Sequence, residues 1–273
     1  VELPNGATAG TCYVLKWDLK RGSTWFSSQS SWPTLDSTVC VEADTDPPDN
    51  PPSSSVSCSS GHIRDGWVTS TQIALDWWGA GDGETGVDGY SVAWDQASGT
   101  VPDTSRDTTE SNATSGTLGD GNWYLHVRTV DNAGNWTTGA THYGPYGIDT
   151  IAPTSVVTGS TLTDPSKSWF YVELSGSDAG SGVASYALQY NIDGGSWQDY
   201  ASAGGPGPSI VLFCGSRYNP GHTYYFRSQA TDGVGHTESW GAAEWSVYIP
   251  AGTDPGGLSD TRCPIMWKNY TIP

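Results

Sequence analysis

The sequence predicts an all-β protein built from two tandem β-sandwich modules. Three observations support this: an internal repeat, apolar side chains at every second position, and turn-forming Gly, Pro, Asp and Ser between these segments. The repeat is clearest between "NWYLHVRTVDNAGN" and "HTYYFRSQATDGVGH". When the two are aligned, matching residues recur at every second position: Trp123 with Tyr224, Leu125 with Phe226, Val127 with Ser228, Thr129 with Ala230, and Asp131 with Asp232.

This alternation is that of a β-strand with one buried and one solvent-facing side. A helix would need apolar residues three and four positions apart, and both segments end in Asp-x-x-Gly, which suits a turn. The intervening residues are therefore expected on the solvent face: Tyr124, His126 and Arg128 in the first copy, and Tyr225, Arg227 and Gln229 in the second.

A second pair of segments matches in the same way, "GDGETGVDGYSVAWD" against "SDAGSGVASYALQYN". It predicts strands over Val87–Trp94 and Val183–Tyr190. Further strands are predicted at Thr71–Trp78, Ser168–Leu174, Ser209–Phe213 and Glu244–Ile249. No segment has a convincing helical pattern.

Proline-bearing joints divide the chain. They lie at Asp44–Ser55, Ile148–Val157 and Ile249–Gly257, where a strand should end and a new unit begin. We therefore expect an N-terminal segment (1–46), a first module (47–150), a second module (151–250) and a C-terminal tail (251–273).

The segment "YNPGHTYYFRSQATD" resembles a strand of fibronectin type III domains, with Tyr218, Pro220, Gly221 and Tyr224 at the corresponding places and His222 at the usual Thr. The resemblance implies that Tyr224 is a structural tyrosine corner, whose hydroxyl bonds to the backbone upstream.

"DGNWYLHVRTVDNAGNW", followed by "YGPYGIDTIAP", is similar to the end of a bacterial fibronectin- or immunoglobulin-like module of a secreted or cell-surface protein. Trp123 takes the place of the corner tyrosine there, and an indole cannot make the same hydroxyl bond. The implied fold is two immunoglobulin-like (fibronectin type III-like) β-sandwiches over residues 47–250, with N-terminal and C-terminal extensions.

Composition narrows the function. The 273 residues carry 29 acidic and 11 basic side chains, a net charge of −18, which argues against binding to nucleic acid or to an anionic membrane surface. No apolar run is long enough to span a bilayer, and a chain that starts at Val1 fits a mature secreted protein or an excised fragment.

The five cysteines show no spacing typical of a metal site. In an exported protein most would pair, and we expect Cys12 with Cys40 and Cys214 with Cys263, although other arrangements are open. Cys58 would then be the odd residue, either a buried thiol, which we favour, or an intermolecular link.

No motif for catalysis is present: there is no nucleophile elbow, zinc-protease helix motif or phosphate-binding glycine loop. The histidines, at positions 62, 126, 142, 222 and 236, lie apart in the sequence. We therefore expect a non-catalytic protein without cofactors.

Acidic turns offer the only metal candidates. Asp82, Glu84 and Asp88 are the best set for calcium, yet no Asp-x-Asp-x-Asp-Gly loop occurs, and we favour solvated turn carboxylates. In the same way "DNAGN" and "DGVGH" are interpreted as hairpin turns in which Asp binds its own backbone, rather than as ligand-binding tips.

The aromatic residues between the core positions form a possible contact surface. Tyr124, Trp136, Trp197, Tyr225 and Trp240, together with Trp77, could line a protein contact or a sugar platform, although edge packing explains any one of them. Asn112, Asn135 and Asn269 match the glycan acceptor pattern.

These observations predict an extracellular structural protein that self-assembles with other chains through edge strands or its terminal segments, at a cell surface or in a filament. The alternative is a pair of carbohydrate-binding or adhesion modules from a larger secreted protein.

Overall fold

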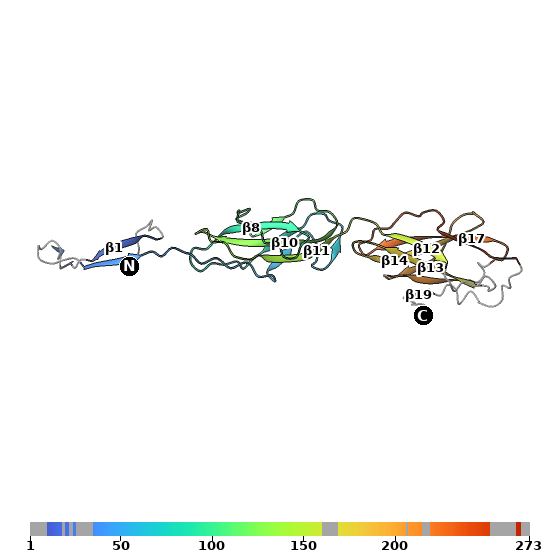
Figure 1. The fold of residues 1–273 in the computed structure, drawn as a ribbon, viewed down its shortest axis with the longest axis horizontal. Helices are drawn as coiled ribbons and strands as arrows, with labels where there is room; N and C mark the ends of the chain where they lie inside the picture. The colour runs from blue at the N-terminus through green and yellow to red at the C-terminus, as the bar shows by residue number, and fades with distance from the viewer. Residues whose placement is uncertain are drawn as a thin grey trace.

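The computed structural model describes residues 10–17, 20–21, 24–25, 35–159, 169–205, 207–214, 219–251 and 266–268. The chain is all-β, and the described residues contain no helix. Figure 1 shows a two-stranded ribbon at the N-terminal end, then a group of strands that includes β8, β10 and β11, and then a group that includes β12, β13, β14 and β17.

The N-terminal ribbon consists of β1 (Cys12–Trp17) and β4 (Leu35–Cys40), which pair in antiparallel fashion. In the sequence between β1 and β4 lie two short strands, β2 (Lys20–Arg21) and β3 (Thr24–Trp25), which pair with each other. Cys12 lies opposite Cys40 in the register, and the two sulfur atoms form the predicted disulfide.

Two sheets follow the ribbon and share one apolar core, in a sandwich-like arrangement. The three-stranded sheet has the order β5 (Val56–Cys58), β7 (Ala74–Trp77), β9 (Asn112–Thr114). The four-stranded sheet has the order β6 (Trp67–Val68), β11 (Thr141–Ile148), β10 (Gly121–Asp131), β8 (Val87–Asp95). The buried core residues are Ile73, Leu75, Trp77, Tyr90, Leu125, Val127, Tyr143, Tyr146 and Ile148. We call this unit the first sandwich.

Two four-stranded sheets form the second sandwich. One has the order β12 (Thr154–Gly159), β13 (Trp169–Ser177), β16 (Ser209–Cys214), β19 (Met266–Lys268), so that the last described strand of the chain is its edge. The other has the order β15 (Gln198–Gly204), β14 (Val183–Ile192), β17 (Thr223–Asp232), β18 (Trp245–Tyr248). Its core is rich in aromatic rings, among them Phe170, Tyr186, Phe213, Tyr224 and Phe226, and shares no residue with the first core.

Strand β17 alternates as the sequence predicts. Tyr224, Phe226, Ser228, Ala230 and Asp232 are buried, and the residues between them are half-buried. This strand therefore has one core face and one outer face along its whole length.

Strand β10 departs from the prediction. His126, expected on the solvent face, is completely buried, and burial is continuous from Leu125 to Val127. The reason is the segment after β8, which folds back over the outer face of the sheet. On this face the hydroxyl of Thr100 donates to Asp95 at 2.6 Å, and the carbonyl of Pro102 accepts from Nη1 of Arg128 at 3.2 Å.

The remaining predicted strands are present with shifted ends. The segment predicted at Thr71–Trp78 forms a strand only over Ala74–Trp77, and that predicted at Ser168–Leu174 runs from Trp169 to Ser177. Strands β5, β6, β9, β11, β12 and β15 were not predicted. Several of them are too short or too polar to show an apolar alternation.

Candidate functional site

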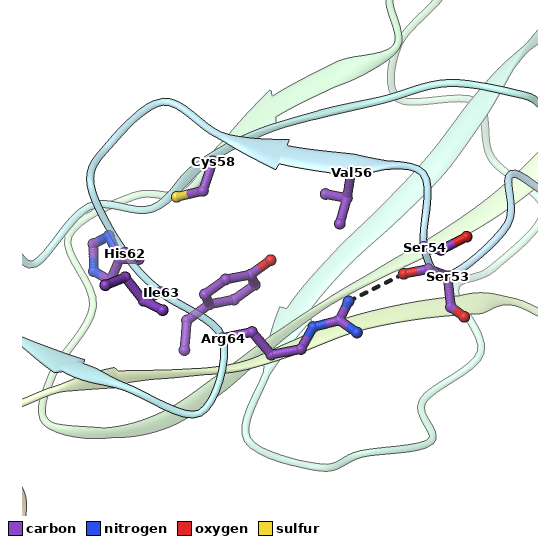
Figure 2. A pocket seen from close by; sticks show the side chains of 8 residues that line it. Ser53, Ser54, Val56, Cys58, His62, Ile63 and Arg64 are labelled. Carbon is purple, nitrogen blue, oxygen red and sulfur yellow. Dashed lines mark hydrogen bonds between the residues drawn. The ribbon is translucent and has the colours of Figure 1, made fainter.

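A cavity of about 430 Å³ lies beside β5. Its side chains come from the segment before β5, from β5 itself, from the loop that follows it and from β11 (Figure 2). The polar lining includes Cys58, His62 and Arg64, and the apolar lining includes Val56, Ile63 and Tyr146. The pocket thus combines a thiol, an imidazole and a guanidinium group on an apolar wall.

A directional chain of hydrogen bonds connects the thiol to the imidazole. Nε2 of His62 lies 3.1 Å from the carbonyl oxygen of Ser70, and a carbonyl only accepts, so Nε2 of the neutral ring carries the proton. Nδ1 is then the acceptor for the hydroxyl of Ser60, 2.9 Å away. Sγ of Cys58 lies 3.3 Å from that hydroxyl oxygen, so the thiol donates to Ser60 and Ser60 donates to His62.

The surroundings keep this imidazole neutral. Desolvation by burial lowers the pKa of His62 and outweighs the opposing hydrogen bond to Ser70. His62 is therefore a proton acceptor at neutral pH.

Arg64 supplies the positive charge of the pocket. Its Nη2 donates to the backbone carbonyl of Ser53 at 3.1 Å, and among the described residues no carboxylate forms an ion pair with it. Its remaining N–H donors make the pocket suited to a ligand that carries a carboxylate or another small anion.

The sequence contains a signal for this pocket that apolar patterning misses. Cys58, Ser60, His62 and Arg64 lie within seven residues of one another, and the chain bends between Cys58 and His62, with Gly61 at a φ of 84°. Our strand predictions rest on apolar alternation alone, and Cys58 was expected to be buried. It is instead a free, half-buried cysteine that lines the pocket.

Of the other cysteines, Cys12 and Cys40 are joined. Cys214 ends β16, and Cys263 lies outside the described residues, so their pairing stays a prediction.

The three calcium candidates do not converge. Asp88 forms an ion pair with Arg106. Asp82 instead caps its own turn, because its Oδ2 accepts the amides of Glu84, Thr85 and Gly86 at 3.0, 2.7 and 2.6 Å. These bonds, with that of Gly86 first, lower the pKa of Asp82, whereas repulsion from Asp44 raises the pKa of Glu84.

Within the described ranges, two other groups bring possible metal ligands within 4.8 Å of one another: Asp44, Asp82 and Asp131, and Asp149, Asp232 and His236. The two groups occupy equivalent places in the repeat. Each contains the Asp of an Asp-Thr pair, Asp44-Thr45 in the first group and Asp149-Thr150 in the second.

Carboxylates in both groups already accept hydrogen bonds from backbone amides. Oδ1 of Asp131 accepts from Ala133 and Asn135, and Oδ1 of Asp232 accepts from Val234, Gly235 and His236. This is the turn geometry expected for "DNAGN" and "DGVGH", and it accounts for these acids without a ligand.

Residues of both sandwiches form hydrogen bonds with Asp149 and Thr150 at the junction between them. Oδ2 of Asp149, a buried residue, accepts the amide of Ser181 at 2.8 Å, and both the amide and the hydroxyl of Thr150 donate to Oδ1 of Asp120 at 2.8 Å. A side chain at Gly180 would collide with Asp149, since a Cβ there would lie 2.4 Å from its Cγ. The Asp-Thr pair therefore connects the two sandwiches directly.

The predicted aromatic residues are half-buried, and most contact cations or rings. The guanidinium of Arg227 lies between the rings of Trp197 and Trp240, 4.2 and 5.0 Å from their centroids. Arg128 lies 5.7 Å from the ring of Trp136. Tyr124 stacks on His126 and Trp77 belongs to the core, whereas Tyr225 lies on the outer face of β17.

The two corner residues both bond to the upstream backbone. The hydroxyl of Tyr224 accepts from the amide of Asn219 at 2.6 Å and donates to its carbonyl at 3.2 Å. In the first sandwich the indole nitrogen of Trp123 donates to the carbonyl of Gly119 at 2.8 Å. An indole thus makes one of the two bonds of the hydroxyl, which the comparison of Trp with Tyr in the sequence did not predict.

His126 is the buried centre of a polar network. Its Nδ1 lies 2.7 Å from Nδ1 of His142, and its Nε2 lies 3.1 Å from Oδ1 of Asp95, which also receives the hydroxyl of Thr100 on its other oxygen. Burial, together with repulsion from His126, lowers the pKa of His142. The network connects β8, β10 and β11; Tyr124 stacks on His126, whereas the side chain of Asp95 is 38% exposed.

In the part of the chain that the structure describes, no helix has the length and apolar character needed to span a bilayer. No protein-family model and no curated protein matches the sequence.

Proposed function

We propose that this chain is a non-catalytic extracellular structural protein, in which two immunoglobulin-like (fibronectin type III-like) modules, residues 47–150 and 151–250, carry terminal segments that assemble with other chains. The observation that carries this proposal is the N-terminal ribbon. Among the described strands, β1 and β4 pair only with each other, so each has one unpaired edge.

An isolated two-stranded ribbon is marginally stable in water. The disulfide between Cys12 and Cys40 closes the base of this one, which lowers the entropy that folding must overcome. Among the described strands neither β1 nor β4 has a second neighbour, and an edge of this kind pairs readily with a strand of another chain. A disulfide-closed ribbon with open edges is therefore suited to docking.

Charge favours a second copy of the chain as the partner. Lys16 lies in β1, and Lys20 and Arg21 form β2, so the segment from β1 to β4 carries three of the 11 basic residues against two acidic ones, Asp18 and Asp36. The rest of the chain is strongly acidic, because the total net charge is −18. A segment with a small positive net charge and a strongly acidic body attract each other across two copies.

The second sandwich illustrates how such an edge can be used. Strand β19 of the tail pairs with β16 through Ser209–Lys268, Ile210–Trp267 and Val211–Met266. A terminal segment thus extends a sheet by strand addition within the chain itself. The same mode of pairing between chains would extend the assembly.

Sedimentation velocity over a range of protein concentrations tests the proposal. The full chain should associate as its concentration rises, and the variant Lys16→Gln/Lys20→Gln/Arg21→Gln should associate much less. As a matched control, Arg64→Gln/Arg106→Gln removes cations from the first sandwich and should leave association unchanged. A chain that stays monomeric at every concentration would refute the assembly proposal.

The alternative, a carbohydrate-binding module pair, needs aromatic faces open to a sugar. In the second sandwich the guanidinium of Arg227 already covers a face of both Trp197 and Trp240. This arrangement favours the structural function. Binding on a glycan array that is lost in Trp240→Ala would reverse the preference.

A further inference from the structure

The Cys58 pocket has no place in the assembly function, yet it holds a nucleophile, a proton acceptor and a cation together. We propose that it is a site of covalent thiol modification, at which Cys58 forms a mixed disulfide with a small organic disulfide that carries a carboxylate group. The pocket is outside the ribbon and the tail, so this inference does not depend on the proposed function.

The proton acceptor is already aligned. Thiol–disulfide exchange requires the thiolate, so the thiol must first lose its proton. Cys58 donates to Ser60, and Ser60 donates to Nδ1 of His62, at 3.3 and 2.9 Å. The proton of Cys58 can move to Ser60 as the proton of Ser60 moves to His62. The fixed tautomer of His62, set by Ser70, leaves only Nδ1 to receive it.

The exchange balances without any further reagent. Sγ of Cys58 attacks one sulfur atom of the small disulfide, the new S–S bond forms as the old one breaks, and the second half leaves as a thiolate. That thiolate takes up the proton held by His62. The small disulfide is the oxidant, and a medium that maintains the Cys12–Cys40 disulfide is one in which such molecules persist.

Arg64 determines the chemical class of the ligand. Its guanidinium lines the pocket together with Cys58 and has no acidic partner among the described residues. Its bond to the carbonyl of Ser53 occupies Nη2 and leaves other donors for a carboxylate. The apolar wall of Val56 and Tyr146 suits the carbon skeleton of the ligand. A cavity of about 430 Å³ accommodates a small molecule rather than a protein segment.

Two disulfide reagents test the proposal on the full chain. 5,5′-Dithiobis(2-nitrobenzoate) carries a carboxylate on each half, and 4,4′-dithiodipyridine carries no charge at neutral pH. Rates of thiol release are measured with both, and peptide mass spectrometry assigns the labelled residue. Cys58→Ser gives the background from any other free thiol.

In Arg64→Gln we expect the benzoate reagent to react about tenfold more slowly, the effect of one lost charge-assisted bond, while the dipyridine rate is unchanged. Arg106→Gln, which removes an exposed arginine of the same sandwich, should change neither rate. His62→Gln should slow both reagents and alter the dependence of the rate on pH.

The proposal is overturned if Cys58 is not labelled, or if Arg64→Gln slows both reagents equally or neither. If His62→Gln does not fold, the comparison of the two reagents on Arg64→Gln still decides the matter.

Discussion

The two sandwiches place equivalent strands in different surroundings. In β17 of the second sandwich, buried and half-buried residues alternate without interruption. In β10 of the first, His126 is completely buried, whereas Arg227, which aligns with it in β17, is half-buried. The strands share a pattern of apolar residues but not the structure that covers their polar face.

The difference arises in the segment after the preceding strand. After β14 the chain forms a regular strand, β15, which pairs at the edge of the sheet. After β8 it forms an irregular segment that crosses the outer face. There the carbonyl of Pro102 accepts a hydrogen bond from Nη1 of Arg128 at 3.2 Å. A covered polar face must satisfy its own hydrogen bonds, which explains the network around His126. On the outer face of the second sandwich, the guanidinium of Arg227 contacts the rings of Trp197 and Trp240 and donates to the carbonyl of Gly241 at 3.0 Å.

Core truncation should give the largest effect in both sandwiches. Phe226→Ala and Leu125→Ala each remove a completely buried side chain from equivalent positions of the two cores. We expect the free energy of unfolding to fall by about 3–5 kcal/mol for Phe226→Ala and about 2–5 kcal/mol for Leu125→Ala. Urea titration measures these losses.

Hydrogen–deuterium exchange shows where each loss falls. Because the cores share no residue, faster exchange should be confined to the sandwich that carries the substitution. If exchange accelerates equally in both, the two cores unfold as one unit and the comparison fails.

His126→Ala and Tyr225→Ala test the difference between the outer faces directly. Removing His126 leaves His142 and Asp95 without their shared partner and opens a cavity, so we expect a loss of about 2–3 kcal/mol in unfolding free energy. Tyr225 is half-buried, and its removal should cost less than about 1 kcal/mol. Equal losses in the two variants would contradict the assignment of a covered face to the first sandwich alone.

The same contrast shows how far the sequence could be interpreted. Alternation correctly placed Leu125 and Phe226 in the cores. Removal of an apolar side chain from water lowers the free energy in any strand, so the apolar face of a strand is the buried one. It failed for His126, because burial of that residue depends on the polar segment after β8, which carries no apolar period. The prediction assigned each strand two faces but had no information on a distant covering segment.

The candidate site was missed for a related reason. The polar residues of the pocket stand at every second position of the sequence: Cys58, Ser60, His62 and Arg64. Because our strand predictions rest on apolar residues, they did not connect these four. Their relation to Tyr146 depends on the neighbouring strand β11, which was not predicted. Cys12 with Cys40 was accessible to the sequence, since a short segment with two cysteines closes most simply on itself.

The corner residues give a smaller test of equivalence. Tyr224→Phe removes two hydrogen bonds to Asn219, and Trp123→Phe removes one to Gly119. We expect unfolding free energies lower by about 1–2 kcal/mol for Tyr224→Phe and about 1 kcal/mol for Trp123→Phe, the latter including the smaller ring. A negligible effect for Trp123→Phe in urea titration would show that the indole is no functional substitute for the hydroxyl.

The smallest expected difference is in the response to pH. Burial lowers the folded-state pKa of His142 below its ordinary value of 6.5, so the unfolded chain binds the proton more tightly. Stability of the first sandwich is therefore fully present above that value and is lost as the pH falls from 6.5 toward the folded pKa. His62, whose pKa is lowered by burial as well, acts in the same direction.

The second sandwich should respond in a more acidic range. Hydrogen bonds from Ser181 and Ile151, despite the opposing effect of burial, hold the pKa of Asp149 below 3.8, so this contribution is lost only as the pH falls below that value. At about pH 5.5, exchange in β10 should accelerate relative to about pH 7.5 after correction for intrinsic rates, while β17 stays protected. The double variant His62→Gln/His142→Gln should reduce the difference, because the two imidazoles whose pKa is lowered by burial are then absent from the first sandwich. A β17 that loses protection together with β10 would assign the pH response to the whole chain rather than to the covered face.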